Sequence, residues 1–239
     1  MLNFRALAVR ISFCPICDRR SVMVKLDDQH VAVRCVRCRA SAVTLSLVSV
    51  LKDLVPSLSS MDVYELSARG PLFAHLMKRA RRVTCSEYFT DVPLGEYFCG
   101  IQCQDAQRLT YPSESFDLCT STEVFEHVAD DRRAFAEMWR VLRPGGWLVF
   151  TVPLDVHADR TIERARQLPD GKIEYLLEPE YHVDPIRPRR RILAFRTYGT
   201  DIVQALQAAG FSTAKLVSPG VRIPWGMERP VVIAQKQLR

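Results

Sequence analysis

The chain has 239 residues, of which 48% are hydrophobic and 25% are charged, and its net charge is +6. This length accommodates one sizeable core and a small appendage, and the composition excludes a disordered or low-complexity chain. The longest apolar stretch, 40–51, falls far short of the roughly 20 residues that a membrane-spanning helix needs. The N-terminus lacks the pattern of a secretory signal. We therefore expect a cytoplasmic protein with two domains, no membrane partner and a buried helix at 40–51.

Four of the eight cysteines form two C-x-x-C pairs near the N-terminus. Cys14 and Cys17 make the first pair, and Cys35 and Cys38 make the second. Two such pairs at this separation point four thiolates at one zinc ion and leave no open coordination position. We predict a structural zinc ribbon over 1–40, with a redox-active pair as the alternative.

Inside the predicted ribbon, two β-rich runs at 22–26 and 30–34 flank a turn at 27–29, which is typical of a hairpin. His30 is interpreted as a solvated hairpin residue. The remaining cysteines are expected to be buried thiols, as in a reducing compartment: Cys85, Cys99, Cys103 and Cys119.

From residue 61 to 239, short apolar runs alternate with helical patterns, which is typical of a doubly wound α/β sheet. Seven strands are expected, at 62–66, 82–86, 100–103, 116–120, 146–152, 212–218 and 231–235. Pro71, Asp130 and Thr200 each suit the start of a helix. A helix within 41–60 links the two domains. The segment at about 153–195 is too long for an ordinary connection, which favours a functional lid or binding loop.

Two stretches within the larger domain carry a resemblance to a known family. They are 116–128, which reads FDLCTSTEVFEHV, and 140–153, which reads RVLRPGGWLVFTVP. These stretches resemble the fourth and fifth strand regions of class I S-adenosylmethionine-dependent methyltransferases, and in particular the small bacterial enzymes with a cysteine-rich ribbon before the domain. The resemblance covers 61–236. It implies a Rossmann-like sheet of seven strands with a reversed last hairpin, and a cofactor across the carboxyl ends of the first four strands.

The resemblance implies cofactor-binding roles at these strand ends for Glu65, Ser67, Ala68, Gly70, Glu87, Tyr88, Asp105, Ala106, Ser121 and Thr122. Glu65 and the loop after it would bind the methionine end of S-adenosylmethionine, although the usual G-x-G-x-G pattern is reduced to Gly70 here. Glu87 would accept both ribose hydroxyls and Asp105 the adenine amino group. The alternatives are an exposed glutamate at a strand end and an aspartate that forms a turn.

The candidate catalytic residues are His127, Glu123 and His182. Methyl transfer from a sulfonium gains most of its rate from alignment, and a base is needed only where the acceptor is protonated. His127 titrates near neutral pH and Glu123 lies close by, while His182 comes from the long insertion. A structural role for His127 and a solvated position for His182 are the alternatives.

We expect an enzyme that methylates an O or N atom of a small molecule or glycan precursor. An RNA or other nucleic-acid methyltransferase is the second hypothesis, favoured by the positive charge and by basic runs at 34–39, 78–82 and 187–191. The run at 78–82 also suits a helix end, and the run at 187–191 an acidic acceptor or an exposed loop. A non-catalytic cofactor-binding scaffold is the third. The sequence determines neither the acceptor nor the oligomeric state.

Overall fold

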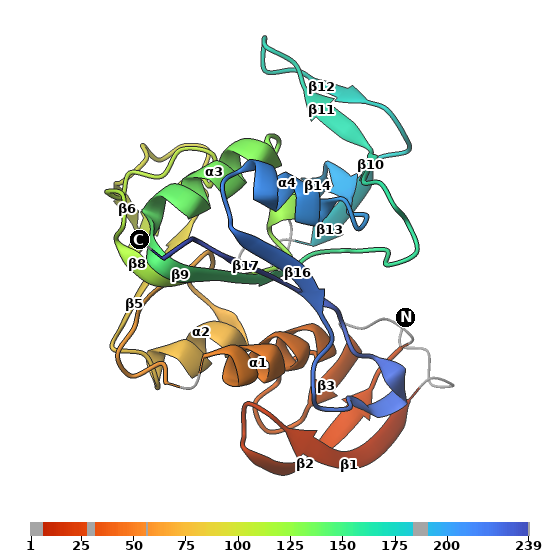
Figure 1. Cartoon of the computed structure of the whole chain (residues 1–239). Coiled ribbons are helices and arrows are strands. Elements are labelled where there is room, and N and C mark those ends of the chain that lie inside the picture. The colour runs from red at the N-terminus through yellow and green to blue at the C-terminus, as the bar shows by residue number, and fades with distance from the viewer. Residues whose placement is uncertain (1–6, 28–31, 56, 184–190, 239) are drawn as a thin grey trace.

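The computed structural model describes residues 7–27, 32–55, 57–183 and 191–238, and its centre is an eight-stranded sheet (Figure 1). In spatial order the strands are β16 (Thr213–Val217), β17 (Val231–Gln235), β9 (Leu142–Thr151), β8 (Phe116–Thr122), β4 (Asp62–Glu65), β5 (Arg82–Glu87), β7 (Ile101–Cys103) and β6 (Tyr97–Phe98). Strands β9, β8, β4, β5 and β7 are parallel, whereas β17 is antiparallel to both of its neighbours.

The expected strands are all present, and so is the reversed hairpin, but the count of seven was wrong. Tyr97–Phe98 adds an eighth strand, antiparallel to β7, at one edge. A two-residue strand has no periodicity to detect, because it exists only where the chain folds back onto its neighbour.

In the described part of the chain four α-helices cover the two faces of the sheet. Helices α1 and α2 lie on one side, and α3 and α4 lie on the other (Figure 1). Their bounds are α1 (Ala42–Leu54), α2 (Gly70–Met77), α3 (Asp131–Val141) and α4 (Ile202–Ala208). Alternate residues of β8 serve the two faces: Leu118 packs in the core beneath α1 and α2, and Cys119 in the core beneath α3 and α4. The buried helix expected at 40–51 is therefore part of the sheet's packing.

The helix starts agree with the sequence in two of three cases. Pro71 lies in the first turn of α2, and the carboxylate of Asp130 caps α3 by accepting from the Arg133 amide at 3.0 Å. The predicted cap at Thr200 was wrong. Residue 201 is the N-cap of α4, and the Thr200 hydroxyl instead donates to the Ala158 carbonyl in the insertion.

The N-terminal module is a three-stranded antiparallel sheet of β1 (Ala8–Cys14), β2 (Arg19–Lys25) and β3 (Val33–Cys35). Strand β1 was not predicted, and part of the expected turn, with His30, lies outside the described residues. The connection from β16 to β17, which contains η3 (Pro224–Gly226), packs on this module. The Arg10 guanidinium lies 5.4 Å from the ring centre of Trp225, so the C-terminal hairpin and the module share a contact.

The insertion at 153–195 forms small sheets rather than an irregular loop (Figure 1). The pairs are β10 (Ile162–Glu163) with β15 (Arg196–Thr197), β11 (Ala165–Gln167) with β12 (Ile173–Tyr175), and β13 (Glu180–Val183) with β14 (Arg191–Ala194). Residues 184–190, with most of the third basic run, lie outside the described part of the chain. Among the described residues, no helix has the length and hydropathy to span a membrane.

Gly199 allows the returning end of the insertion to approach its beginning. A Cβ at this position would lie 2.4 Å from the Arg160 carbonyl carbon and 2.8 Å from the Ala158 carbonyl oxygen. We expect Gly199→Ala to lower the free energy of unfolding by about 1–3 kcal/mol, because the backbone must move to admit the methyl group. Denaturant titration measures this change.

Gly220→Ala is the matched control for this substitution. Its Cβ would meet only the carboxylate tip of Asp53, at 3.2 Å, and a flexible side chain can move aside. Equal losses of stability in the two variants would contradict the close approach at Gly199.

Candidate active site

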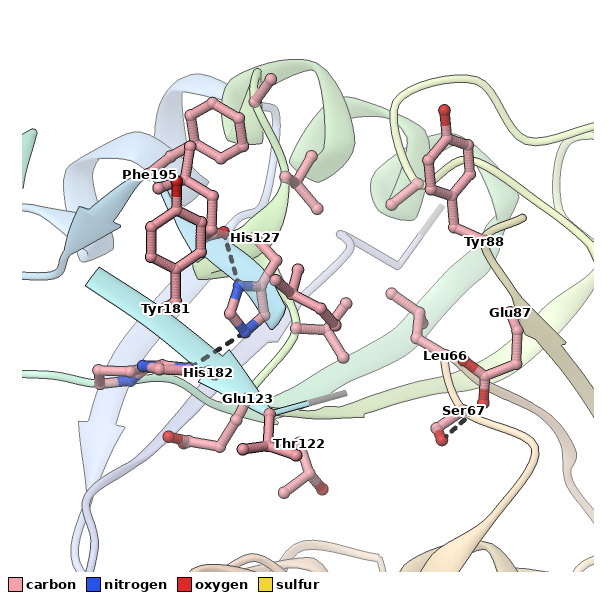
Figure 2. A pocket seen from close by; sticks show the side chains of 18 of the residues that line it. Leu66, Ser67, Glu87, Tyr88, Thr122, Glu123, His127, Tyr181, His182 and Phe195 are labelled. Atoms are coloured by element: carbon pink, nitrogen blue, oxygen red, sulfur yellow. Dashed lines mark hydrogen bonds between the residues drawn. The ribbon is translucent and has the colours of Figure 1, made fainter. Parts of the chain in front are cut away.

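A cavity of about 1330 Å³ opens where β4, β5, β7 and β8 end. Its floor comes from the residues that follow these strands, and its opposite wall comes from β13 and β14 of the insertion. Figure 2 shows Ser67 and Glu87 on one side and His127 and His182 on the other. Carboxyl ends of parallel strands are where doubly wound sheets bind their ligands.

Glu87 holds the loop that follows β4. One of its carboxylate oxygens accepts hydrogen bonds from the Ala68 amide at 2.8 Å and the Ser67 hydroxyl at 3.0 Å (Figure 2). The exposed ring of Tyr88 lies beside it in the cavity wall. These hydrogen bonds to Glu87 of β5 therefore fix the conformation of the glycine-poor loop after β4.

Asp105 forms a turn directly after β7. Its Oδ1 accepts from the Gln107 amide at 2.9 Å and from the Gln107 side-chain amide at 3.1 Å. Asp105, Ala106 and Gln107 all line the cavity. The carboxylate thus has the turn-forming role, and it also lies in the wall where a ligand can reach it.

Four of the predicted cofactor residues are not in the cavity wall: Glu65, Ala68, Gly70 and Ser121. Ala68 is nevertheless adjacent, through its bond to Glu87. Glu65 is only 1% exposed and accepts a hydrogen bond from Thr120. Burial raises the pKa of Glu65 to about 8, and the nearby charge of Glu87 acts in the same direction.

Glu123 follows β8 with a backbone φ of +52° and points to Arg229. The Arg229 guanidinium lies 3.2 Å from one Glu123 oxygen, and its backbone amide donates to Ser46 of α1. Sequence reasoning missed Arg229, since it lies 106 positions from Glu123 and belongs to the C-terminal hairpin connection. This ion pair favours a structural role for Glu123 over that of a free base.

His127 and His182, predicted independently as candidate bases, meet at one point. His127 ends η2 (Phe125–His127), and its Nδ1 donates to the Leu193 carbonyl at 2.8 Å. Its Nε2 lies 3.1 Å from Nδ1 of His182, and Nε2 of His182 lies 3.3 Å from a Glu180 carboxylate oxygen. The two rings are perpendicular, with centres 4.8 Å apart.

Glu126 lies directly behind this pair and is fully buried. Its Oε1 is 3.6 Å from Nε2 of His127 and 3.8 Å from Nδ1 of His182. Within the described residues, neither carboxylate oxygen has a hydrogen-bond donor from another residue. Burial raises the pKa of Glu126 well above its usual range. Glu126 lies in the stretch 116–128 that carries the family resemblance, but the sequence had no signal that this carboxylate is sealed from water.

The four cysteines of the N-terminal module converge. Sγ of Cys14 lies 3.7 Å from that of Cys38, and Sγ of Cys17 lies 3.9 Å from that of Cys35. Tetrahedral zinc with Zn–S bonds of about 2.3 Å separates its sulfurs by about 3.8 Å, so the residues fit this metal.

The expectation for the other cysteines was only partly right. Cys103 and Cys119 are buried and Cys85 is half-buried, but Cys99 is exposed. Cys99 lies in the tight turn between β6 and β7 with a φ of +51°.

The strand order, the reversed hairpin and the cavity at the strand ends agree with the Rossmann-like fold that the resemblance to class I S-adenosylmethionine-dependent methyltransferases implies. Residues 69–150 match the family described as "Methyltransferase domain". The matched segment is about a third of the chain.

Individual relatives agree with this class. The chain is 56% identical over 45 residues to a demethylmenaquinone methyltransferase of Deinococcus radiodurans, covering 19% of each chain. It is 31% identical over 108 residues to the 27-O-demethylrifamycin SV methyltransferase of Amycolatopsis mediterranei, covering 44% of this chain and 39% of that one. The matches thus span less than half of these relatives.

A solved structure from Listeria monocytogenes, assigned to the S-adenosylmethionine-dependent methyltransferases, has the same fold. Its TM-score is 0.50 at 12% identity, over 80% of this chain and 98% of that one.

The buried carboxyl of Glu65 makes stability depend on pH. The unfolded chain ionises this group near its ordinary pKa of 4.5, whereas the folded chain keeps the proton up to about pH 8. The folded state binds more protons between these values, so its stability falls as pH rises, by at most about 1.4 kcal/mol per pH unit.

We expect Glu65→Gln to remove this fall in folding stability with rising pH. Its stability relative to the wild type should rise from about pH 5 to pH 8 and then level off, as measured by urea denaturation across this range. Glu163→Gln, at an exposed position of β10, is the control and should show no such trend. A constant difference between Glu65→Gln and the wild type would mean that the carboxyl is ionised in the folded chain.

Proposed function

We propose that the chain transfers a methyl group from S-adenosylmethionine to an O or N atom of a small-molecule acceptor. The observation that carries the proposal is a cavity whose two walls differ in chemistry: acidic side chains at the strand ends, and a histidine pair from η2 and the insertion. At about 1330 Å³ the cavity exceeds the roughly 300–1,000 Å³ typical for one ligand, so it has room for two.

The strand-end wall suits the cofactor. Glu87 would accept from the ribose hydroxyls, and Asp105 with the amides of its turn would bind the adenine edge. Ser67, at the loop after β4, and Thr122, at the end of β8, line the same wall toward the cavity centre. The residues present therefore fit an adenosine with an attached amino acid.

The opposite wall suits the acceptor. Tyr181 and Phe195 add aromatic surface beside His127 and His182 (Figure 2). Aromatic rings beside the two histidines, Glu180 and Arg191 favour a flat, partly apolar acceptor that carries a hydroxyl or amine. The names of the relatives, which refer to a menaquinone precursor and to a rifamycin, agree with this class of acceptor. A glycan precursor remains the less favoured acceptor.

The chemistry is a displacement at the methyl carbon. S-adenosylmethionine supplies an electrophilic methyl group on a sulfonium when bound. The chain's own part is to align the acceptor atom with that carbon, to exclude water and to engage the acceptor's polar group at the histidine pair.

Nucleic-acid methylation is the weaker alternative. In the run at 78–82, Arg81 forms two hydrogen bonds to Asp62, and in the run at 34–39 the Arg34 side chain donates to the Arg39 carbonyl. These basic groups are thus partly engaged within the fold. Salt-sensitive RNA binding would favour this alternative, and cofactor binding without transfer to any acceptor would favour a scaffold.

We also infer that the cysteine cluster holds a structural zinc ion. Four converging thiols satisfy zinc, which stabilises a module too small to have a large core of its own. We propose a ribbon at 1–40, a linking helix at 41–60 and the methyltransferase domain at 61–239, in a cytoplasmic protein.

The cofactor proposal predicts a loss of affinity in Glu87→Ala. S-adenosylhomocysteine should bind more weakly by about 1–3 kcal/mol in calorimetry, because the ribose loses a charged hydrogen-bond partner. Glu178→Ala, at an exposed position outside the cavity wall, should leave the affinity unchanged. Unchanged affinity in Glu87→Ala would remove Glu87 from the cofactor site.

The zinc proposal predicts that Cys17→Ser loses the bound zinc and destabilises the N-terminal module. Binding of S-adenosylhomocysteine should largely persist, since Glu87 lies in the central sheet and Asp105 lies in the turn directly after β7. Metal analysis, thermal unfolding and calorimetry measure the three effects. Cys99→Ser, at the exposed cysteine outside the cluster, should change none of them, and full zinc retention in Cys17→Ser would contradict the assignment.

A further inference from the structure

The side chains of Glu126, His127 and His182 form a compact triad that neither the cofactor wall nor the cysteine cluster explains. Their ligand atoms lie within 4.8 Å of one another. Two come from η2 and one comes from β13, so the triad exists only when the insertion is docked.

The three separations fit a metal ion. The sides of the triangle are 3.1 Å between the two nitrogens, and 3.6 and 3.8 Å from these nitrogens to Oε1 of Glu126. A triangle with these sides has one point about 2.0 Å from all three corners. Zinc bonds to histidine nitrogen and carboxylate oxygen are about 2.0–2.2 Å long.

Each histidine has one ring nitrogen that faces away from the centre of the triad, and the contact of this outer nitrogen orients the ring as a metal ligand. Nδ1 of His127 faces the Leu193 carbonyl and Nε2 of His182 faces the Glu180 carboxylate, and both partners accept hydrogen bonds. The protons therefore belong on the outer nitrogens, and the inner nitrogens turn lone pairs toward each other at 3.1 Å. Facing lone pairs repel, so a positive species must lie between them.

The Glu126 carboxylate indicates which species that is. It is fully buried, it points at the same spot, and it has no hydrogen-bond donor from another described residue. A single proton shared by the histidines would leave this carboxyl unsatisfied, at a considerable cost in a dry interior. A divalent cation satisfies all three groups at once.

We propose that Glu126, His127 and His182 bind a divalent transition-metal ion such as Zn²⁺, with at least one coordination position open to the cavity. Three protein ligands and an open position are typical of catalytic rather than structural zinc. Both histidines line the cavity, whereas Glu126 lies behind them. Resting on the proposed function, the open position would take the acceptor's oxygen or nitrogen and lower the pKa of an acceptor hydroxyl.

Metal content of the full-length chain tests the site. After equilibration with Zn²⁺ and removal of excess metal, we expect His182→Ala to carry one zinc ion fewer per chain than the wild type. His157→Ala, which removes an exposed histidine of the insertion, is the matched control and should retain the wild-type content. Equal content in His182→Ala and the wild type would overturn the proposal, because a shared proton predicts that result.

Two further measurements separate this site from the cysteine cluster and from misfolding. When the protein is loaded with Co²⁺, the His182→Ala variant should lose the absorption bands that lack thiolate charge-transfer character. It should keep the thiolate bands, which belong to the cysteine cluster. Glu180→Gln, which keeps the ligands but weakens the outer hydrogen bond, should lower Zn²⁺ affinity roughly 10- to 100-fold. Loss of the thiolate bands in His182→Ala, or wild-type affinity in Glu180→Gln, would count against the proposal.

Calorimetry with S-adenosylhomocysteine distinguishes the two proposals from each other. Binding that persists in His182→Ala, with one metal ion lost, supports both. A wild-type chain that binds the second metal ion but not S-adenosylhomocysteine would remove the cofactor function and leave the metal site standing.

Discussion

The docking of the insertion onto the segment after β8 is the contact on which the cavity depends. Arg196, which is buried, donates to the carbonyls of Phe125, Val128 and Ala129. Beside it, the Phe195 amide donates to the Glu126 carbonyl at 2.7 Å. These backbone groups would otherwise be buried without partners, so the arginine stabilises a short 3₁₀ turn that has little stability of its own. Without this contact the second wall of the cavity would not exist.

A second set of contacts joins the cysteine module to the same cavity. Arg34, Ser41 and Val43 reach the cavity wall from the module and the start of α1. Arg229, in the connection that packs on the module, pairs with Glu123 at the end of β8. A structural metal in the module would therefore stabilise one rim of the cavity, although it lies outside the site of the proposed chemistry.

The two proposed metal sites differ in their ligands, and this difference separates a structural metal from one that can bind a substrate. The cysteine cluster offers four thiols, which complete a tetrahedron and leave no position for a substrate. The triad at the cavity offers two imidazoles and one carboxyl, with both imidazoles facing open space. Harder nitrogen and oxygen ligands with a vacant position suit a metal that binds and activates an acceptor.

Local patterns in the sequence determined the parallel sheet, the helix starts marked by Pro71 and Asp130, and the convergence of the four cysteines, because each depends on residues close together in the chain. The family resemblance implied roles for Glu87 and Asp105 at strand ends, and His127 and His182 were candidates as histidines near the expected acceptor pocket. Only the tertiary structure decided that Glu65 is sealed in the sheet, that Glu123 pairs with Arg229, and that the two histidines meet at Glu126. These outcomes join segments 55 to 106 positions apart, and no local pattern encodes which distant side chain arrives.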